Sequence, residues 1–457
     1  MMTESQRAAL AEYAAVKGQC PARERLAALF DDGVYTETGS NLRAGENLAG
    51  VVTAYGYIGG TPPYAFSQDS TVMKGAVSLA HSAKICKMFE LAARNGVPVV
   101  GIYDSCGAFV EDGADALNAY SDILLSMGSL SGVVPMVSVI SGVCAGTMAM
   151  IASSADFSVI TEGAELYLDA SGNNASAESA AKSGAVSAYA KSDAEAMDTV
   201  RRYLSLMPQN NLSPLPEFEF DAPVSAAFDN AENAAESIAD AGSILEVYGE
   251  YGTASYTALC TVSGVTAGIA ATNKTKDKLT SADCSKIARF VRLCDAYSIP
   301  VITVADTEGF DLHGADMVRA GAALAGAYAE ASCAKIALVS GKACGMAYIA
   351  FAGRNVAADA VYALPEAVIA PMDPVSAAEF LYHDKLKGAD DLAAARAQIA
   401  KEYAENEGSA FAAAAKGAAD EVVTAENVRA AVASVLDVTA GKRLNKRLPK
   451  KHNILPL

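Results

Sequence analysis

Two stretches of small residues follow apolar runs and could do chemistry through their backbone. The run 133–140 leads into Ser141–Ala149, and the run 336–339 leads into Ser340–Tyr348. A strand that enters a glycine-rich turn and then a helix leaves backbone N–H groups unpaired and directed at one place. Such a place suits an anion or a developing oxyanion. Tight packing of a helix on a strand also needs small residues, and for either stretch alone packing is the favoured interpretation.

Composition excludes several classes of function. The net charge of −18 argues against general nucleic-acid binding. The nine cysteines form no CxxC pair and no Cys/His cluster, so we expect no metal site and a reducing, cytoplasmic location. The polar N-terminus is not a signal peptide. The most apolar window, 133–160, is interrupted by serine, glycine and aspartate and predicts strand, turn and helix instead of a membrane span.

The elements that must position the two stretches alternate between helix and strand. We expect a hairpin from 51–57 and 64–66, a helix over 77–95, a buried strand over 97–103 and a helix over 114–127. This alternation predicts an α/β fold with mostly parallel strands. A proline-rich and acidic segment at about 208–240 is expected to be a linker.

The second half of the chain repeats the first. Four features recur at an offset of 202 residues, and they are listed here as pairs: Lys84-Ile85 with Lys286-Ile287, Pro98 with Pro300, Asp104 with Asp306, and Gly107 with Gly309. Ser141-Gly142 and Gly146 recur at an offset of 199 as Ser340-Gly341 and Gly345. The common order of elements predicts an internal duplication with two pockets lined by N–H groups. Asp104 and Asp306 are expected to cap the turns that follow them.

Several motifs together resemble the carboxyltransferase subunits of biotin-dependent acyl-CoA carboxylases and decarboxylases, such as the propionyl-CoA carboxylase β subunit and the methylmalonyl-CoA decarboxylase α subunit. The motifs that carry the resemblance are Gly50–Gly56, Phe66–Val72, His81–Lys87, Asp104–Ala108, Val143–Gly146, Lys342–Tyr348 and the tail Lys450–Leu457. The resemblance extends from about Ala22 to the end of the chain.

The resemblance implies two tandem crotonase-like domains, at 1–215 for the acyl-CoA and at 235–457 for biotin. It implies transfer of a carboxyl group between N1 of biotin and the α-carbon of a short-chain acyl-CoA, with propionyl-CoA and methylmalonyl-CoA favoured. Removing a proton or carboxyl leaves an enolate, which backbone N–H donors stabilise. The family's two oxyanion holes correspond to the catalytic residues Gly146, Thr147, Gly345, Met346 and Ala347. Its substrate-binding loops correspond to Ser105, Cys106, Gly107, Ala108, Gly309 and Phe310.

The resemblance also implies partners. No Ala-Met-Lys-Met biotinylation motif occurs in the sequence, so biotin is expected on a separate biotin carboxyl carrier protein. A biotin carboxylase or a membrane decarboxylase subunit completes such complexes. The family forms homo-oligomers in which the N-domain of one subunit faces the C-domain of another. The basic residues from Lys442 to Lys451 either contact CoA phosphates or a partner, or form a solvated tail.

The chain departs from the family pattern at its two turns. Thr147 and Met346 stand where the family has glycine, so a side chain crowds each pocket or constrains φ. Two alternatives therefore remain open: a biotin-independent crotonase-like acyl-CoA enzyme, and a degenerate scaffold subunit without activity.

Overall fold

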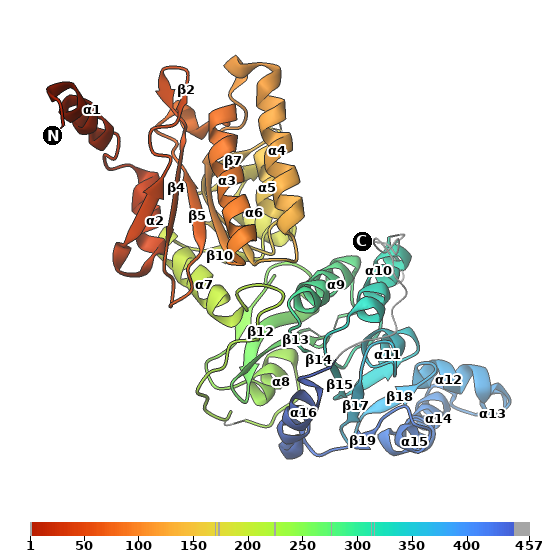
Figure 1. Ribbon diagram of the computed structural model, residues 1–457. Helices are drawn as coiled ribbons and strands as arrows, with labels where there is room; N and C mark the ends of the chain where they lie inside the picture. The colour runs from red at the N-terminus through yellow and green to blue at the C-terminus, as the bar shows by residue number, and fades with distance from the viewer. Residues whose placement is uncertain are drawn as a thin grey trace. The chain divides into compact units, whose positions relative to one another are not determined.

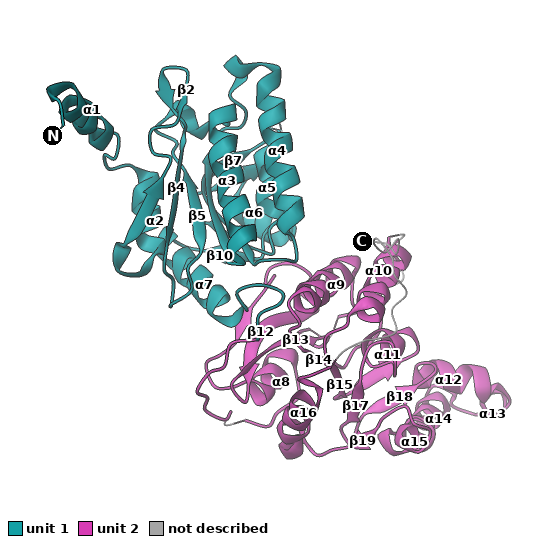
Figure 2. Ribbon diagram, in the orientation of Figure 1, with its two compact units in different colours: residues 1–214 teal, residues 215–457 magenta. Residues whose placement is uncertain are grey.

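Both halves of the chain are built on a central sheet with helices packed against it (Figure 1). The computed structural model describes residues 2–169, 171, 174–223, 225–275, 277–311, 313–314 and 316–442. The chain divides into unit 1, Met1–Pro214, and unit 2, Leu215–Leu457 (Figure 2).

The sheet of unit 1 begins with antiparallel strands and continues with parallel ones. Its order is β1 (Tyr35–Thr38), β4 (Val51–Gly56), β5 (Tyr64–Gln68), β6 (Val99–Ser105), β7 (Met136–Ala145), β8 (Phe157–Thr161) and β10 (Ala188–Ala190), and the short β9 (Glu165–Tyr167) pairs with the end of β7. A separate hairpin joins β2 (Arg43–Ala44) and β3 (Asn47–Leu48).

Seven α-helices accompany this sheet within the described part of unit 1. They are α1 (Glu4–Ala15), α2 (Pro21–Leu29), α3 (Leu79–Asn95), α4 (Ala114–Leu130), α5 (Thr147–Ser153), α6 (Ala177–Lys182) and α7 (Asp193–Leu206). Buried side chains of α3, α4, α5 and α6 form one hydrophobic core with the sheet. The helix α3 carries apolar residues at helical spacing and ends, as expected, at Gly96 in the left-handed conformation.

Unit 2 repeats the same topology. Its sheet has the order β11 (Leu245–Glu246), β12 (Tyr256–Val262), β13 (Val265–Ala271), β14 (Val301–Ala305), β15 (Lys335–Val339), β17 (Ala360–Ala363) and β19 (Glu421–Val422), and a second sheet pairs β16 (Lys342–Cys344) with β18 (Val368–Ala370). Its helices are α8 (Ala231–Ile238), α9 (Ser281–Ala296), α10 (Met317–Glu330), α11 (Met346–Phe351), α12 (Pro374–Leu381), α13 (His383–Lys387), α14 (Leu392–Asn406), α15 (Ala410–Ala415) and α16 (Ala425–Thr439).

The predicted α/β duplication is confirmed, with two boundaries that differ from expectation. Residues 141–145 belong to strand β7 instead of a turn, and β9 pairs with residues 143–145 at the end of this strand. Part of the expected linker is folded, since α8 packs buried alanines and Ile238 into the core of unit 2. The proline-rich stretch marks the division between units, but the acidic stretch that follows is an amphipathic helix.

In each unit a carboxylate lies against a glycine, on strand β7 in unit 1 and between β15 and β16 in unit 2. A methyl group at Gly142 would lie 2.3 Å from Asp104 Oδ1, and one at Gly341 would lie 2.3 Å from Asp306 Oδ1. The Asp-x-x-Gly and Ser-Gly motifs of the repeat are thus two sides of one contact. The aspartates hold the adjacent strand segment, where we had expected them to cap the turns that follow them.

The two carboxylates are held by different partners. In unit 1, Arg25 Nη1 donates to Asp104 Oδ2 at 2.9 Å, and Arg25 Nη2 donates to the carbonyl of Ser141 at 2.9 Å. In unit 2, Asn273 Nδ2 donates to Asp306 Oδ2 at 2.7 Å, and the N–H of Lys342 donates to Oδ1 at 2.8 Å. A charged clamp in one unit therefore corresponds to an uncharged one in the other.

The close contact between Gly142 and Asp104 predicts how a substitution at Gly142 changes stability. Gly142→Ala forces a methyl group into the Asp104 carboxylate and should destabilise unit 1 by about 1–3 kcal/mol. Gly128→Ala is the matched control, because Gly128 lies inside α4 with no atom within 4 Å of an added methyl group. It should stabilise by about 0.5–1 kcal/mol. Urea unfolding of both variants measures the difference, and equal effects would contradict the contact.

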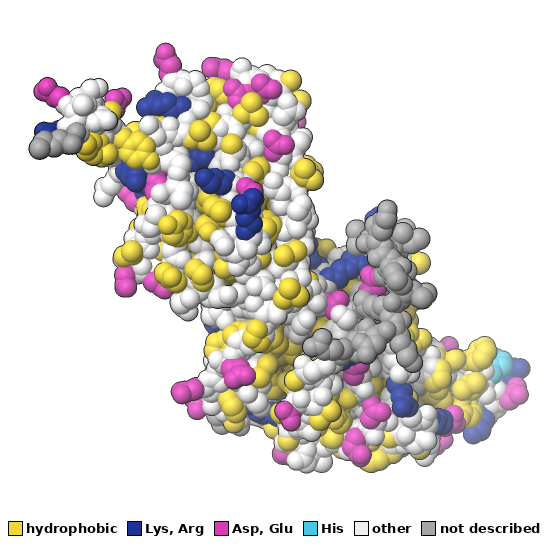
Figure 3. Space-filling model, in the orientation of Figure 1, with side chains coloured by type: hydrophobic (Ala, Val, Ile, Leu, Met, Phe, Trp, Pro, Cys, Tyr) yellow, Lys and Arg dark blue, Asp and Glu magenta, His cyan; other side chains and the backbone are white. Residues whose placement is uncertain are grey.

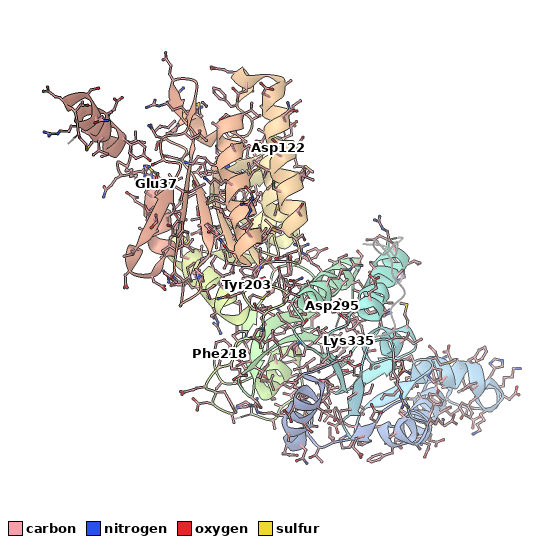
Figure 4. The ribbon with its side chains drawn as sticks, viewed as in Figure 1. Glu37, Asp122, Tyr203, Phe218, Asp295 and Lys335 are labelled. Carbon is pink, nitrogen blue, oxygen red and sulfur yellow. The ribbon has the colours of Figure 1, made fainter. Side chains whose placement is uncertain are left out.

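A buried lysine recurs at the same place in both units. Lys84 on α3 donates to the carbonyl of Val51, and Lys286 on α9 donates to the carbonyl of Ser255 at 2.8 Å. Burial lowers the pKa of each lysine to about 8. A nearby carboxylate acts in the opposite direction and raises the pKa: Glu37 on β1 for Lys84 (labelled in Figure 4) and Glu246 for Lys286. Each lysine ties its helix to the start of the second strand of its sheet, β4 in unit 1 and β12 in unit 2.

The lowered pKa of Lys84 makes stability depend on pH. Between the folded pKa and the unfolded one, the unfolded chain binds more protons, so the contribution of Lys84 to stability rises with pH. Relative to Lys84→Met, the wild-type protein should gain roughly 2 kcal/mol from about pH 7.5 to about pH 9.5. The exposed Lys87 on the same helix supplies the control Lys87→Met. A gap between wild type and Lys84→Met that stays constant with pH would refute this assignment.

Candidate active site

The helix α5 begins at Gly146, whose backbone only glycine adopts readily. Its φ of 64° and ψ of −138° lie in a region that a Cβ atom disfavours. The N–H of Gly146 donates to the carbonyl of Tyr167 on β9 at 2.9 Å. That N–H is therefore not free for a ligand, contrary to our expectation for Gly146. The next two N–H groups, of Thr147 and Met148, have no acceptor among the described residues.

The helix α11 begins in the same way. Gly345 has φ 55° and ψ −122°, and its N–H donates to the carbonyl of Ala370 on β18 at 2.9 Å. The N–H groups of Met346 and Ala347 have no acceptor within the part of unit 2 that is described. The two units thus present the same pair of donors, at 147–148 and at 346–347, each after a glycine fixed by a short strand.

The predicted substrate loop of unit 1 lies beside this helix start. Ser105 is fully buried and pairs with Cys144 in the β6–β7 register, two residues before Gly146. The N–H of Gly107 donates to Ser105 Oγ at 3.2 Å, which tightens the loop. Ala108 bridges to residue 77, and Cys106 is exposed at the tip. The structure therefore brings the predicted residues 105–108 next to residues 146–147.

The corresponding loop of unit 2 lies beside α11. The N–H of Thr307 donates to the carbonyl of Lys342 at 2.8 Å, and the N–H of Gly309 donates to Thr307 Oγ1 at 3.1 Å. The ring of Phe310 is buried and stacks on Phe351 of α11, with centroids 6.1 Å apart. Phe310 therefore supports the helix from beneath, and its ring is not exposed to a ligand.

The first residues of α5 and α11, Thr147 and Met346, have side chains that are exposed on the surface of their units. Thr147 is exposed, and Met346 retains 49% of its surface. Because both residues stand at the first helical position, where a side chain imposes no strain, their N–H groups keep the direction that glycine would give. Neither residue has a positive φ, so the backbone constraint that we expected from these two substitutions does not arise, and crowding of a bound ligand by the exposed side chains stays a prediction.

One charged group near the second helix start escaped the sequence analysis. Lys342 Nζ pairs with Glu308 Oε2 at 2.7 Å and with Asp373. Burial lowers the pKa of Lys342, but hydrogen bonds to Asp373 and Glu308 outweigh it and leave the pKa raised. Its position four residues before Met346, inside the Lys342–Tyr348 motif, was the available signal. The Lys342 ammonium group thus joins Glu308 in the 307–310 loop to Asp373, the residue that caps the start of α12.

Two further expectations concern the whole chain. Among the described helices, none combines the length and the apolar character that crossing a bilayer requires. The basic tail beyond Lys442, including Lys450–Leu457, lies outside the described residues; Lys442 itself pairs with Asp359 Oδ2 at 2.7 Å.

Comparisons with known proteins agree with this architecture. Residues 14–455 match the carboxyl transferase domain family. The chain is 33% identical over 488 residues to the methylmalonyl-CoA decarboxylase subunit alpha of Propionigenium modestum, covering 96% of this chain and 94% of that one. It is 31% identical over 494 residues to the propionyl-CoA carboxylase beta chain of Cereibacter sphaeroides, covering 96% and 94%.

The fold also matches a solved structure. The hexameric transcarboxylase 12S, crystallised with methylmalonyl-coenzyme A and methylmalonic acid, superposes with a TM-score of 0.90 at 31% identity, covering 100% of this chain and 99% of that one. The predicted fold of two tandem crotonase-like domains is confirmed, and so is the family resemblance. The chain belongs to the carboxyl transferase domain family.

Proposed function

We propose that this protein moves a carboxyl group between biotin on a separate carrier protein and the α-carbon of a short-chain acyl-CoA, with propionyl-CoA and methylmalonyl-CoA as the favoured pair. The observation that supports this most is the recurrence of two adjacent free N–H groups at the start of α5 and of α11. Two anionic oxygens develop in such a transfer, one on each reactant, and a duplicated donor pair matches that need.

The donors of unit 1 are suited to the acyl-CoA. When the α-carbon loses its proton or its carboxyl group, negative charge moves onto the thioester oxygen. The N–H groups of Thr147 and Met148 would hold that oxygen, and the loop of Ser105, Cys106, Gly107 and Ala108 would line the acyl group. Gly146, which we expected to donate, serves instead to aim the next two N–H groups.

The donors of unit 2 are suited to biotin. The ureido group has one carbonyl oxygen, and the free N–H groups of Met346 and Ala347 at the start of α11 fit a single anionic oxygen. Gly345 directs these donors, and the backbone of Gly309 lies beside them. When bound, biotin supplies N1 as donor or acceptor of the carboxyl group, while the α-carbon proton moves in the opposite direction.

Oligomerisation follows from the surfaces near both donor pairs. Met150 on α5 and Met346 and Ile349 on α11 each retain about half of their surface or more, at 53%, 49% and 56%. Figure 3 shows further hydrophobic side chains on the face in view. These apolar side chains are available for contact with another subunit, and the solved relative is a hexamer. We propose a homo-oligomer in which the N-domain of one subunit completes a site with the C-domain of another.

Further partners follow from the reaction. The proposed chemistry needs a biotin carboxyl carrier protein, and it needs a biotin carboxylase or a membrane decarboxylase subunit to load or unload the biotin.

Carboxyl transfer by the purified protein tests the proposal. Mass spectrometry measures the loss of the carboxyl group from methylmalonyl-CoA. We expect this loss only when biotin or a biotinylated carrier is present. Turnover without biotin would instead support a crotonase-like acyl-CoA enzyme. A folded protein without turnover on a series of carboxylated CoA esters would support a scaffold subunit.

Proline at position 147 tests the backbone donor itself. Thr147→Pro removes one N–H at the first helical position, where proline is tolerated. Loss of one oxyanion donor should lower kcat by about 10²–10³-fold. Thr147→Ala keeps the N–H and should keep activity. Leu392→Pro at the exposed start of α14 controls for proline at a helix start. Full activity of Thr147→Pro would exclude this N–H as a donor.

A further inference from the structure

The hydroxyl group of Tyr120 on α4 is buried without a hydrogen-bond partner among the described residues. The residue retains only 6% of its surface. Buried polar side chains nearly always find a partner, and one that has none asks for an explanation. A bound molecule that supplies the missing acceptor is one such explanation.

The location of this hydroxyl group points to the acyl-CoA site of unit 1. Tyr120 belongs to the core cluster that contains Cys144 and Met148, and α4 packs against α5. The electrostatic neighbours of the hydroxyl group are the thiols of Cys144 and Cys106. Cys144 precedes Gly146 by two residues, and Cys106 is at the exposed tip of the 105–108 loop. Tyr120 thus lies among the elements that form the proposed site.

The protonation state makes this group a donor. Burial raises the pKa of Tyr120, and the neighbouring thiols of Cys144 and Cys106 raise it further. Burial also raises the pKa of Cys144, so this thiol is neutral as well. A neutral phenol in an apolar surrounding donates one hydrogen bond and gains most from an oxygen acceptor.

Unit 2 offers an internal comparison. Its corresponding helix α10 also carries a buried tyrosine, but the hydroxyl of Tyr328 bonds to Thr303 Oγ1 at 2.8 Å. The Tyr328 hydroxyl is therefore satisfied by the protein itself, whereas the Tyr120 hydroxyl is not, so Tyr328 provides a control for the removal of a buried tyrosine hydroxyl.

We propose that the Tyr120 hydroxyl donates a hydrogen bond to an oxygen of the acyl group bound in unit 1, either the thioester oxygen or an oxygen of the transferable carboxylate. This inference rests on the proposed function. It adds a side-chain donor to a site that otherwise offers backbone donors, and it gives unit 1 a means to select the acyl group.

Binding measurements on the full-length protein test the inference. Calorimetric titration of wild type, Tyr120→Phe and Tyr328→Phe uses methylmalonyl-CoA, propionyl-CoA and CoA. Tyr120→Phe should keep or raise the melting temperature, because it removes an unpaired hydroxyl, and should bind CoA normally. Tyr328→Phe loses a paired hydroxyl, so its melting temperature should fall while its affinities stay unchanged.

The three ligands locate the acceptor. Weaker binding of methylmalonyl-CoA alone, by about 10-fold or more, assigns the hydrogen bond to the carboxylate. An equal loss of about 3- to 10-fold for both esters assigns it to the thioester oxygen. Wild-type affinities in Tyr120→Phe for both esters would overturn the inference and leave the proposed function intact. A wild-type protein that binds neither ester would overturn both.

Discussion

The contact between an aspartate carboxylate and a glycine of the neighbouring segment organises each half of this molecule. At Asp104–Gly142 and at Asp306–Gly341, the carboxylate occupies the space that a side chain would otherwise take. The contact sets how closely the end of one strand approaches the segment that leads into the active helix. The loops at 105–108 and 307–310 and the helix starts at 147 and 346 all follow directly from these paired segments. In each unit, the distance between the loop and the helix start therefore depends on the carboxylate of one aspartate, Asp104 or Asp306.

The two halves have kept this contact while changing what holds it. Arg25 reaches from α2 to Asp104 on β6 and to the carbonyl of Ser141 on β7, so one partly buried side chain joins three elements of unit 1. In unit 2, the Asn273 side chain and the backbone N–H of Lys342, both uncharged donors, hold the Asp306 carboxylate. A buried ion pair that loses one partner is more costly than an uncharged pair in the same position. Unit 1 should thus be less tolerant than unit 2 of substitution near its carboxylate.

Sequence patterns predicted the strands, the helices and the duplication, because hydrophobic periodicity and repeated motifs are local properties. They identified Gly146 and Gly345 but assigned the Gly146 N–H to a ligand, since nothing local reveals that β9, only three residues long, provides its acceptor at Tyr167. Gly142, which Asp104 contacts, is 38 positions away in the sequence. The repeated aspartate and glycine motifs could therefore be recognised, but the contact between them could not be predicted. Tyr120 reads as an ordinary core position on a helix, and only three-dimensional packing shows that its hydroxyl lacks a partner.

The free donors at both helix starts belong to the backbone, so under the proposed function the side chains at these positions need not take part in the reaction. The exposed Thr147 and Met346 can be replaced by any residue except proline without loss of an N–H, provided that Gly146 and Gly345 remain. Under the proposed function, selection can therefore change the side chain at either helix start in single steps that keep the backbone donors. A lineage with such a scaffold is well placed to change its acyl substrate, and the same two positions are natural starting points for directed evolution.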